Sequence, residues 1–137
     1  MSSMKIAVVA LLAPLVVVLG KPPTAWIVTS SGRAQLGYSS YCWATKRQTL
    51  CADYIAPRCG KGPGAAPVVR VRRGERVRFE LGFAPRSVSL SVGRGATQKL
   101  EAARHLTWRA TRSGPLALFA TAKNGDASYV ACIVFRR

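Results

Sequence analysis

The sequence predicts an all-β, immunoglobulin-like sandwich of seven to nine short antiparallel strands, preceded by an N-terminal export signal. Three observations predict this fold. Apolar and polar residues alternate with a period of two through most of the chain after Pro67, which is typical of half-buried strands. Residues that favour turns separate these runs at short intervals. No segment after residue 20 shows the apolar stripe of an amphipathic helix.

Residues 1–20 are predicted to be a signal peptide. Lys5 supplies one positive charge, and residues 6–19 form an apolar run of 14 residues. A membrane-spanning helix needs about 20 apolar residues, so the run favours a cleaved leader, with an uncleaved signal anchor as the alternative. Residues 21–137 are then predicted to form one β-sandwich domain.

The leader decides how the four cysteines are interpreted. An even number of cysteines in a short exported chain predicts disulfides rather than zinc ligands, because the compartment is oxidising. After a first strand at 25–29, the extended runs 36–43 and 49–55 flank a polar turn, which predicts a hairpin that sets Cys42 opposite Cys51. Cys59 is then expected to pair with Cys132, although four cysteines allow three pairings.

Alternation also locates the later strands, at 69–71, 76–83, 87–92, 106–111, 116–122 and 127–135. Residues 73–75, with Gly74 at their centre, are predicted to join the first two of these strands as a short hairpin. Asn124, Gly125 and Asp126 supply residues that tolerate a positive φ at a second turn. The Gly- and Pro-rich residues 56–67 are interpreted as a loop inside the domain.

Strands that are apolar on one face have to cover that face. Two sheets packed face to face are therefore expected, with a small closed β-barrel as the alternative. The aromatic residues of these strands are expected to fill the core: Phe79, Phe83, Trp108, Phe119 and Tyr129.

Three short segments carry a family resemblance: Ser40-Tyr41-Cys42-Trp43, Cys51-Ala52-Asp53-Tyr54 and Gly125-Asp126-Ala127-Ser128-Tyr129. Together they resemble the SYCW…C-x-D…GDASY pattern of small, uncharacterised bacterial exported proteins, over most of residues 36–135. The resemblance implies a secreted or envelope-associated β domain and gives no chemistry. This sequence departs from the pattern by Cys59 and Cys132, which suit a second bridge, and by its arginine content.

The chain carries 21 Lys and Arg against 5 Asp and Glu, a formal net charge of +16, and such a surface attracts anions. Five arginines are predicted to share the polar face of one hairpin as a candidate anion-binding patch: Arg70, Arg72, Arg73, Arg76 and Arg78. Outside the cell the abundant polyanions are phospholipid headgroups and wall polymers. Anionic envelope components, or an envelope protein, are therefore the expected partners. The alternatives are a solvated face of no specific function and, less favoured, nucleic acid, from which a leader removes the chain.

Few residues could build a catalytic or metal site. The sequence has one histidine, His105, no Gly-x-Ser-x-Gly turn and no cysteine pairs at zinc-ligand spacing. Glu75 and Glu80 lie in the arginine-rich segment and are interpreted as charge partners of its arginines rather than as a glycosidase pair. We therefore expect a non-catalytic binding module without a cofactor.

The predicted disulfide-closed hairpin suggests an alternative function. Lys46 and Arg47 lie at its tip, and an exposed, rigid basic loop is how a secreted inhibitor presents itself to a protease. The alternative hypothesis is therefore a secreted protease inhibitor with these two residues in its contact loop. A basic tip that serves solubility alone is the competing explanation.

Overall fold

The computed structural model describes residues 20–53, 59–60 and 65–137. All of the predicted signal peptide except Gly20 lies outside the described residues, as does much of the predicted loop at 56–67. The described residues form these strands: β1 (Ala25–Thr29), β2 (Gly32–Gln35), β3 (Gly37–Ala44), β4 (Thr49–Ala52), β5 (Val68–Val71), β6 (Arg76–Leu81), β7 (Ser87–Val92), β8 (Gln98–Leu100), β9 (His105–Arg109), β10 (Gly114–Ala122) and β11 (Gly125–Phe135). No helix among them is long and apolar enough to cross a membrane.

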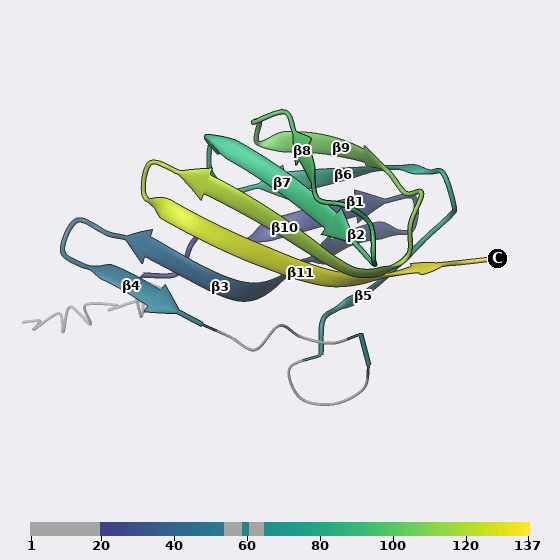
Figure 1. The fold of residues 1–137 in the computed structure, drawn as a ribbon, viewed down its shortest axis with the longest axis horizontal. Coiled ribbons are helices and arrows are strands. Elements are labelled where there is room, and N and C mark those ends of the chain that lie inside the picture. Colours follow the sequence, from purple (N-terminus) through teal and green to yellow (C-terminus); the bar gives the residue numbers. More distant parts are fainter. Residues whose placement is uncertain (1–19, 54–58, 61–64) are drawn as a thin grey trace, which may run out of the picture.

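The strands form two sheets that pack face to face (Figure 1). The four-stranded sheet has the order β2-β1-β6-β9. The seven-stranded sheet has the order β4-β3-β11-β10-β7-β8, and β5 joins it in parallel with β11. The predicted sandwich is confirmed. Because no strand pairing joins the two sheets within the described residues, they do not form the alternative closed barrel.

From β5 onward the strand order is that of an immunoglobulin-like sandwich. β6 pairs with β9 in one sheet, while β7, β10 and β11 lie side by side in the other and β8 extends the sheet beyond β7. The chain before β5 adds one hairpin to each sheet, β1–β2 and β3–β4. The described residues form eleven strands rather than seven to nine, because the short strands β2 and β8 carry no apolar alternation that would predict them.

One apolar core fills the space between the sheets. Alternate residues of β6 are buried, and Leu116, Leu118 and Ala120 of β10 belong to the same buried cluster. Phe79, Phe83, Trp108 and Tyr129 are buried, as expected.

The expectation for Phe119 is wrong, because this side chain is 40% exposed. Phe119 stands on the opposite side of β10 from its buried neighbours Leu118 and Ala120 and so faces away from the core. The strand was predicted correctly, but the side of the strand on which Phe119 lies was not. Ala117 and Phe119 make the outward side of β10 apolar as well, so alternation does not distinguish the two sides.

The chain passes from one sheet to the other at Leu36. This residue is buried between β2 and β3, and its N–H donates to the carbonyl of Ala25 at 2.9 Å. β3 then pairs with residues 125–130 of β11, whereas β5 pairs with residues 132–135 of the same strand. β3 and β5 therefore cover successive halves of β11.

The predicted hairpin at 73–75 is not formed. β5 pairs with β11, and β6 pairs with β1 and β9, so the two strands belong to different sheets. Their connection is a corner between the sheets, in which Gly74 adopts a φ of 85°. The carboxylate of Glu75 closes this corner by accepting the N–H groups of Arg72 at 2.6 Å and Ser30 at 3.1 Å. Alternation predicted both strands, but it does not identify their partners.

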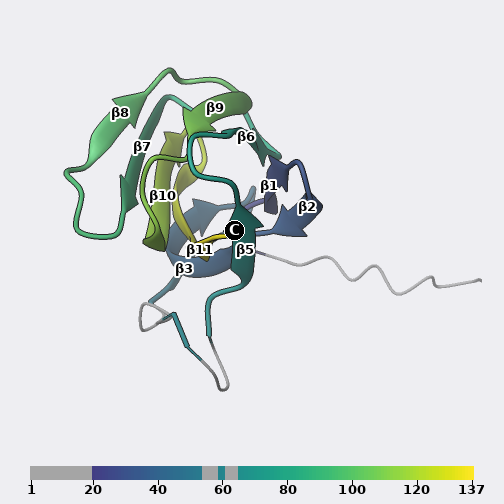
Figure 2. The ribbon, with the colours of Figure 1, turned by 90° about the vertical axis from the view of Figure 1, so that its right-hand side faces the viewer.

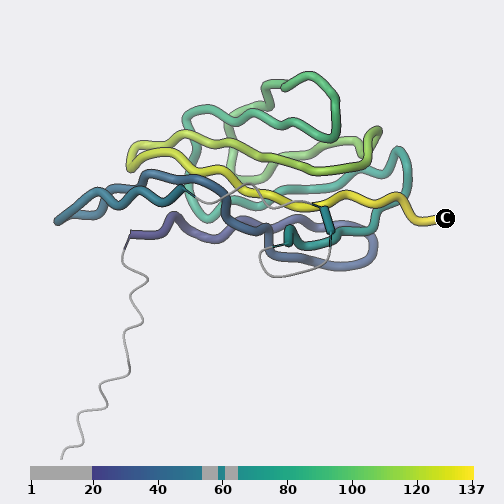
Figure 3. Tube along the Cα trace, turned by 60° about the horizontal axis from the view of Figure 1, so that its bottom comes forward, coloured from purple at the N-terminus to yellow at the C-terminus, as the bar shows by residue number. Residues whose placement is uncertain are grey.

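Both predicted disulfides are present, Cys42–Cys51 and Cys59–Cys132. The hairpin has the expected register, with Trp43 opposite Leu50, and the tube in Figure 3 shows it extending beyond the sandwich. The two bonds indicate an oxidising, extracytoplasmic environment. Next to this hairpin Gly125 has a φ of 144°, and any Cβ there would collide with the Cys42 carbonyl.

Candidate anion-binding surface

The outer face of the four-stranded sheet carries most of its polar side chains. These residues alternate with the buried residues of the same strands and therefore point away from the core. The strand register aligns them in three rows: Gln35, Trp26, Glu80 and His105; Arg33, Val28, Arg78 and Thr107; Arg76 and Arg109. We call this surface, defined by Arg33, Arg76, Arg78 and Arg109, the basic face.

Glu80 holds the centre of the basic face. Its carboxylate lies 3.4 Å from Nε of Arg33, 3.9 Å from Nη2 of Arg78 and 3.8 Å from Nε2 of His105. The guanidinium of Arg33 also stacks on Trp26, with its central carbon 3.9 Å from the ring centroid. Exposed ion pairs of this kind add little stability.

Arg76 and Arg109 face each other directly across β6 and β9. Among the described residues no carboxylate lies within ion-pair distance of either one. Like charges placed opposite each other in a sheet are destabilising, and an anion between them relieves this repulsion. Since guanidinium groups bind phosphate and carboxylate through paired donors, this pair is the part of the basic face most available to a ligand.

The outer face of the seven-stranded sheet has a different character. The outward residues of its central strands β11, β10 and β7 are mostly small or uncharged, and Asp126 is the charged residue among them. Phe119 lies in the middle of this face, opposite Ser128 on one side and Ser89 on the other. Its outer strands add Lys99 on β8 and Arg70 on β5, so the strands of this face carry two outward cations beside Asp126, whereas the basic face carries four arginines beside Glu80.

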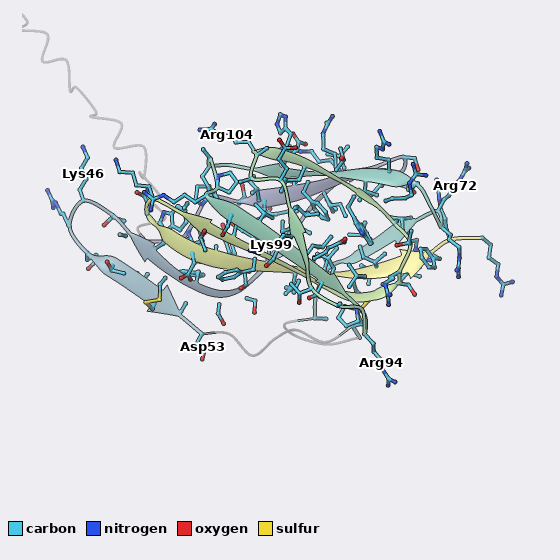
Figure 4. The ribbon with its side chains drawn as sticks, turned by 45° about the horizontal axis from the view of Figure 1, so that its top comes forward. Lys46, Asp53, Arg72, Arg94, Lys99 and Arg104 are labelled. Carbon is cyan, nitrogen blue, oxygen red and sulfur yellow. A yellow bond between two sulfur atoms is a disulfide. The ribbon has the colours of Figure 1, made fainter. Side chains whose placement is uncertain are left out.

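The five arginines predicted to form one patch are divided by the fold. Arg76 and Arg78 lie on the basic face, whereas Arg70 lies on β5 in the other sheet. Arg72 and Arg73 lie in the corner that connects the sheets, where the Arg73 guanidinium stacks over Phe135 at 4.7 Å. Figure 4 shows Arg72 at the end of the molecule opposite Lys46. The grouping on a single hairpin face is thus wrong.

The sequence interpretation missed Arg33 and Arg109 as members of the basic face. Arg109 occupies the polar phase of an alternating run that was recognised, but the run gave no reason to place it beside Arg76. Arg33 lies in the short strand β2, which shows no pattern of its own. They reach the same surface only because β2 pairs with β1 and β9 pairs with β6, at the two ends of one sheet.

Lys46 and Arg47 lie exposed at the turn of the disulfide-closed β3–β4 hairpin, as expected. Thr45 closes this turn, with its N–H donating to the Gln48 carbonyl at 2.7 Å. A shallow hollow of about 590 Å³ beside the turn is lined by Trp43, Lys46 and Lys123 among others.

Within the described part of the chain no group of three or more His, Cys, Asp or Glu side chains is arranged to hold a metal ion. Comparison with protein-family models, with curated proteins and with solved structures finds no match to this chain. The resemblance to small exported bacterial proteins therefore stays a prediction, and any function has to be argued from the surface itself.

Proposed function

We propose that this protein is an exported, non-catalytic β-sandwich that binds anionic polymers of the bacterial cell envelope through its basic face. The observation that carries the proposal is the unequal charge of the two outer faces. Arg33, Arg76, Arg78 and Arg109 share one face with a single carboxylate, Glu80. On the strands of the other face the outward charges are Arg70, Lys99 and Asp126, which leave a smaller positive excess.

A sheet face suits a polymer better than a small ligand. Neighbouring strands are about 4.8 Å apart, so the arginines of β2, β6 and β9 offer donors at several points on one flat surface. Glu80 is paired with Arg33 and Arg78, and Arg76 and Arg109 have no carboxylate partner among the described residues. Phosphate or carboxylate groups repeated along a lipid surface or a wall polymer match this arrangement.

The test is sedimentation of the mature chain with phosphatidylglycerol-containing vesicles and with insoluble wall polymer. Binding should be strong at low ionic strength and fade by about 0.5 M NaCl, because exposed charges are screened within about 5 Å there. The triple variant R76S/R78S/R109S should lose about 100-fold in affinity, since each arginine contributes about 1 kcal/mol near an anionic surface.

A matched control removes three exposed charges elsewhere, as R47S/R86S/R94S. It should bind much more tightly than the basic-face variant. Equal losses in the two triple variants would mean that net charge alone drives binding. Binding that persists unchanged in high salt would contradict the proposal directly.

Protease inhibition is the second candidate, favoured by the rigid β3–β4 hairpin with Lys46 and Arg47 exposed at its turn. A trypsin-like protease should then be inhibited stoichiometrically, and R47S should relieve the inhibition. Rapid cleavage after Arg47 with no loss of protease activity would exclude this function.

A further inference from the structure

An open groove lies where the edge of the four-stranded sheet approaches β5. Its volume is about 440 Å³, within the range of about 300–1,000 Å³ that is usual for ligand sites. β2 supplies one wall through Arg33 and Ala34, and β5 supplies the other through Val68, Val69 and Arg70. The two strands lie near each other in both Figure 2 and Figure 3. Val68, on the β5 wall, is 53% exposed.

The backbone of β5 offers unused hydrogen-bonding groups to this groove. In the parallel ladder with β11, the carbonyls of Pro67 and Val71 accept the N–H groups of Cys132 and Arg136. The register therefore turns the backbone groups of 67, 69 and 71 toward β11 and those of Val68 and Arg70 toward the groove. Among the described residues no backbone hydrogen bond outside the strand ladders uses these groups of Val68 or Arg70.

The edge of β2 also has backbone groups that face away from its own sheet. The N–H of Leu36 donates to the carbonyl of Ala25, so the backbone groups of Leu36 face β1, and those of Ala34 and Gly32 do the same. The backbone groups of the alternate residues Arg33 and Gln35 therefore point away from β1. β2 is the outermost strand of its sheet. The groove is thus bordered on both sides by strand edges of four residues each.

Among the described residues β2 and β5 do not pair with each other. At one end they meet, where a Cβ on Gly37 would lie 3.3 Å from the Pro67 side chain. At the other end the Glu75 carboxylate bridges them, because it accepts the N–H groups of Ser30, just before β2, and of Arg72, just after β5. An added strand of about four residues, roughly 13 Å long, has the length of this space.

We propose that an extended acidic peptide segment of a partner protein binds in this groove as an additional strand. Hydrogen bonds to the groove-facing groups of Val68 and Arg70 on β5, and of Arg33 on β2, would hold its backbone. Side chains that point inward would lie near Ala34 and Val69 and should be small and apolar. Those that point outward would lie near Arg33 and Arg70 and should be carboxylates, and Arg70 has no ion-pair partner among the described residues.

This proposal does not depend on envelope binding by the basic face, and its test separates the two. The probe is a fluorescein-labelled, terminally blocked heptapeptide in which Glu and Val alternate, titrated with the oxidised mature chain and followed by anisotropy. V68P removes one groove-facing N–H without touching the ladder to β11 and should weaken binding about fivefold, the effect of one lost hydrogen bond. R70S should weaken binding about threefold, and it serves the test if V68P does not fold.

Matched controls lie on another edge of the molecule. T49P places proline on the outer edge of β4, and R47S removes an exposed charge at the adjacent turn. Both should bind the peptide as the unaltered chain does, and so should R76S/R78S/R109S within about twofold. A peptide N-methylated at its Val residues, or one in which Lys replaces Glu, should not bind.

Three results would overturn the proposal. The first is equal binding of the N-methylated peptide, which would mean that only charge is recognised. The second is equal weakening by V68P and T49P. The third is a V68P-sensitive dimer in sedimentation equilibrium, which would make a second copy of the chain the occupant.

Discussion

The hydroxyl of Tyr129 donates to the carbonyl of Pro23 at 2.7 Å, and the hydroxyl of Tyr38 donates to the carbonyl of Pro22 at the same distance. The two rings lie against each other, with centroids 5.6 Å apart. Burial, together with the neighbouring Tyr38, raises the pKa of Tyr129, and burial raises the pKa of Tyr38. Both hydroxyls therefore stay protonated and keep donating, so the segment that follows the predicted leader is attached to the seven-stranded sheet.

Replacing Tyr129 with phenylalanine should lower the free energy of unfolding by about 1–2 kcal/mol, because the partly buried carbonyl of Pro23 loses its donor. Urea denaturation at pH 7 measures this loss. A tyrosine whose pKa is raised by folding stabilises the folded state at a pH below about 10, the ordinary pKa of tyrosine. This stabilisation is lost as the pH rises above that value. The decline in stability above about pH 10 should therefore be smaller in Y129F, and an unchanged decline would contradict this account.

Glu75 should contribute stability that depends on pH. Although some desolvation opposes its ionisation, the backbone N–H groups of Arg72 and Ser30, the Ser30 side chain and the charge of Arg136 lower the pKa of Glu75. A lowered carboxyl pKa adds stability above the ordinary value of about 4.3, and this is lost as the pH falls below it. E75Q should thus destabilise the protein at pH 7 and have little effect near pH 2.

The control for this prediction is E101Q. Glu101 is exposed, and no ion pair involves its carboxylate among the described residues. Thermal melts of the two variants from pH 2 to pH 7 should separate as the pH rises. Parallel curves would show that the carboxylate of Glu75 is not what holds the corner between β5 and β6.

At the scale of elements, the two disulfides tie different parts of the fold. Cys42–Cys51 lies across one hairpin and closes a separation of 9 residues. Cys59–Cys132 joins the segment between β4 and β5 to the last strand, across a separation of 73 residues. The first bond strengthens a contact that the hairpin already makes, whereas the second joins segments far apart in the sequence.

Removing the two bonds should therefore have unequal effects. In the chain-entropy model the disulfide that closes the longer loop stabilises the folded state by about 4 kcal/mol, and the disulfide that closes the shorter loop does so by about 3 kcal/mol. C59S/C132S should unfold at lower urea concentration than C42S/C51S, each compared with the oxidised parent. If C42S/C51S proves the less stable variant, unfolded-chain entropy is not the main contribution of these bonds.

The predicted strands show how far sequence patterns reach at this scale. Alternation located most of them, and the residues around 46–47 fixed the β3–β4 register, because a tight turn allows one pairing. The corner at 73–75 looked like a hairpin in sequence and is not one. A short glycine-containing connection can turn a chain back within one sheet or pass it to the facing sheet, and only the other strands that compete for β5 and β6 decide between these outcomes.

At the scale of the whole molecule, the dominant feature is the formal net charge of +16, of which every charge except that of Lys5 belongs to residues 21–137. Self-repulsion of this size opposes the compact state, and dissolved salt screens it. Raising NaCl from about 10 mM to about 200 mM shortens the Debye length from about 30 Å to below 10 Å and should raise the melting temperature. R76S/R78S/R109S should show a smaller rise, because Arg76 and Arg109 face each other. A melting temperature that is flat or falls over this range would contradict this view.

The sequence by itself determined the properties that depend on neighbours in the chain. These are the alternation that buries one side of each strand, the turn that pairs Cys42 with Cys51, the remaining pairing of Cys59 with Cys132, and the excess of positive charge. Tertiary structure alone decided which strands distant in the sequence lie side by side. In the folded chain β5 and β6 belong to different sheets, and Arg33 and Arg109 lie on the same face as Arg76 and Arg78. A groove lies between β2 and β5. The physical reason is that burial depends on which side of a strand a residue occupies, whereas a binding surface depends on which strand is next to it, and pairing between distant strands leaves no local pattern in the sequence.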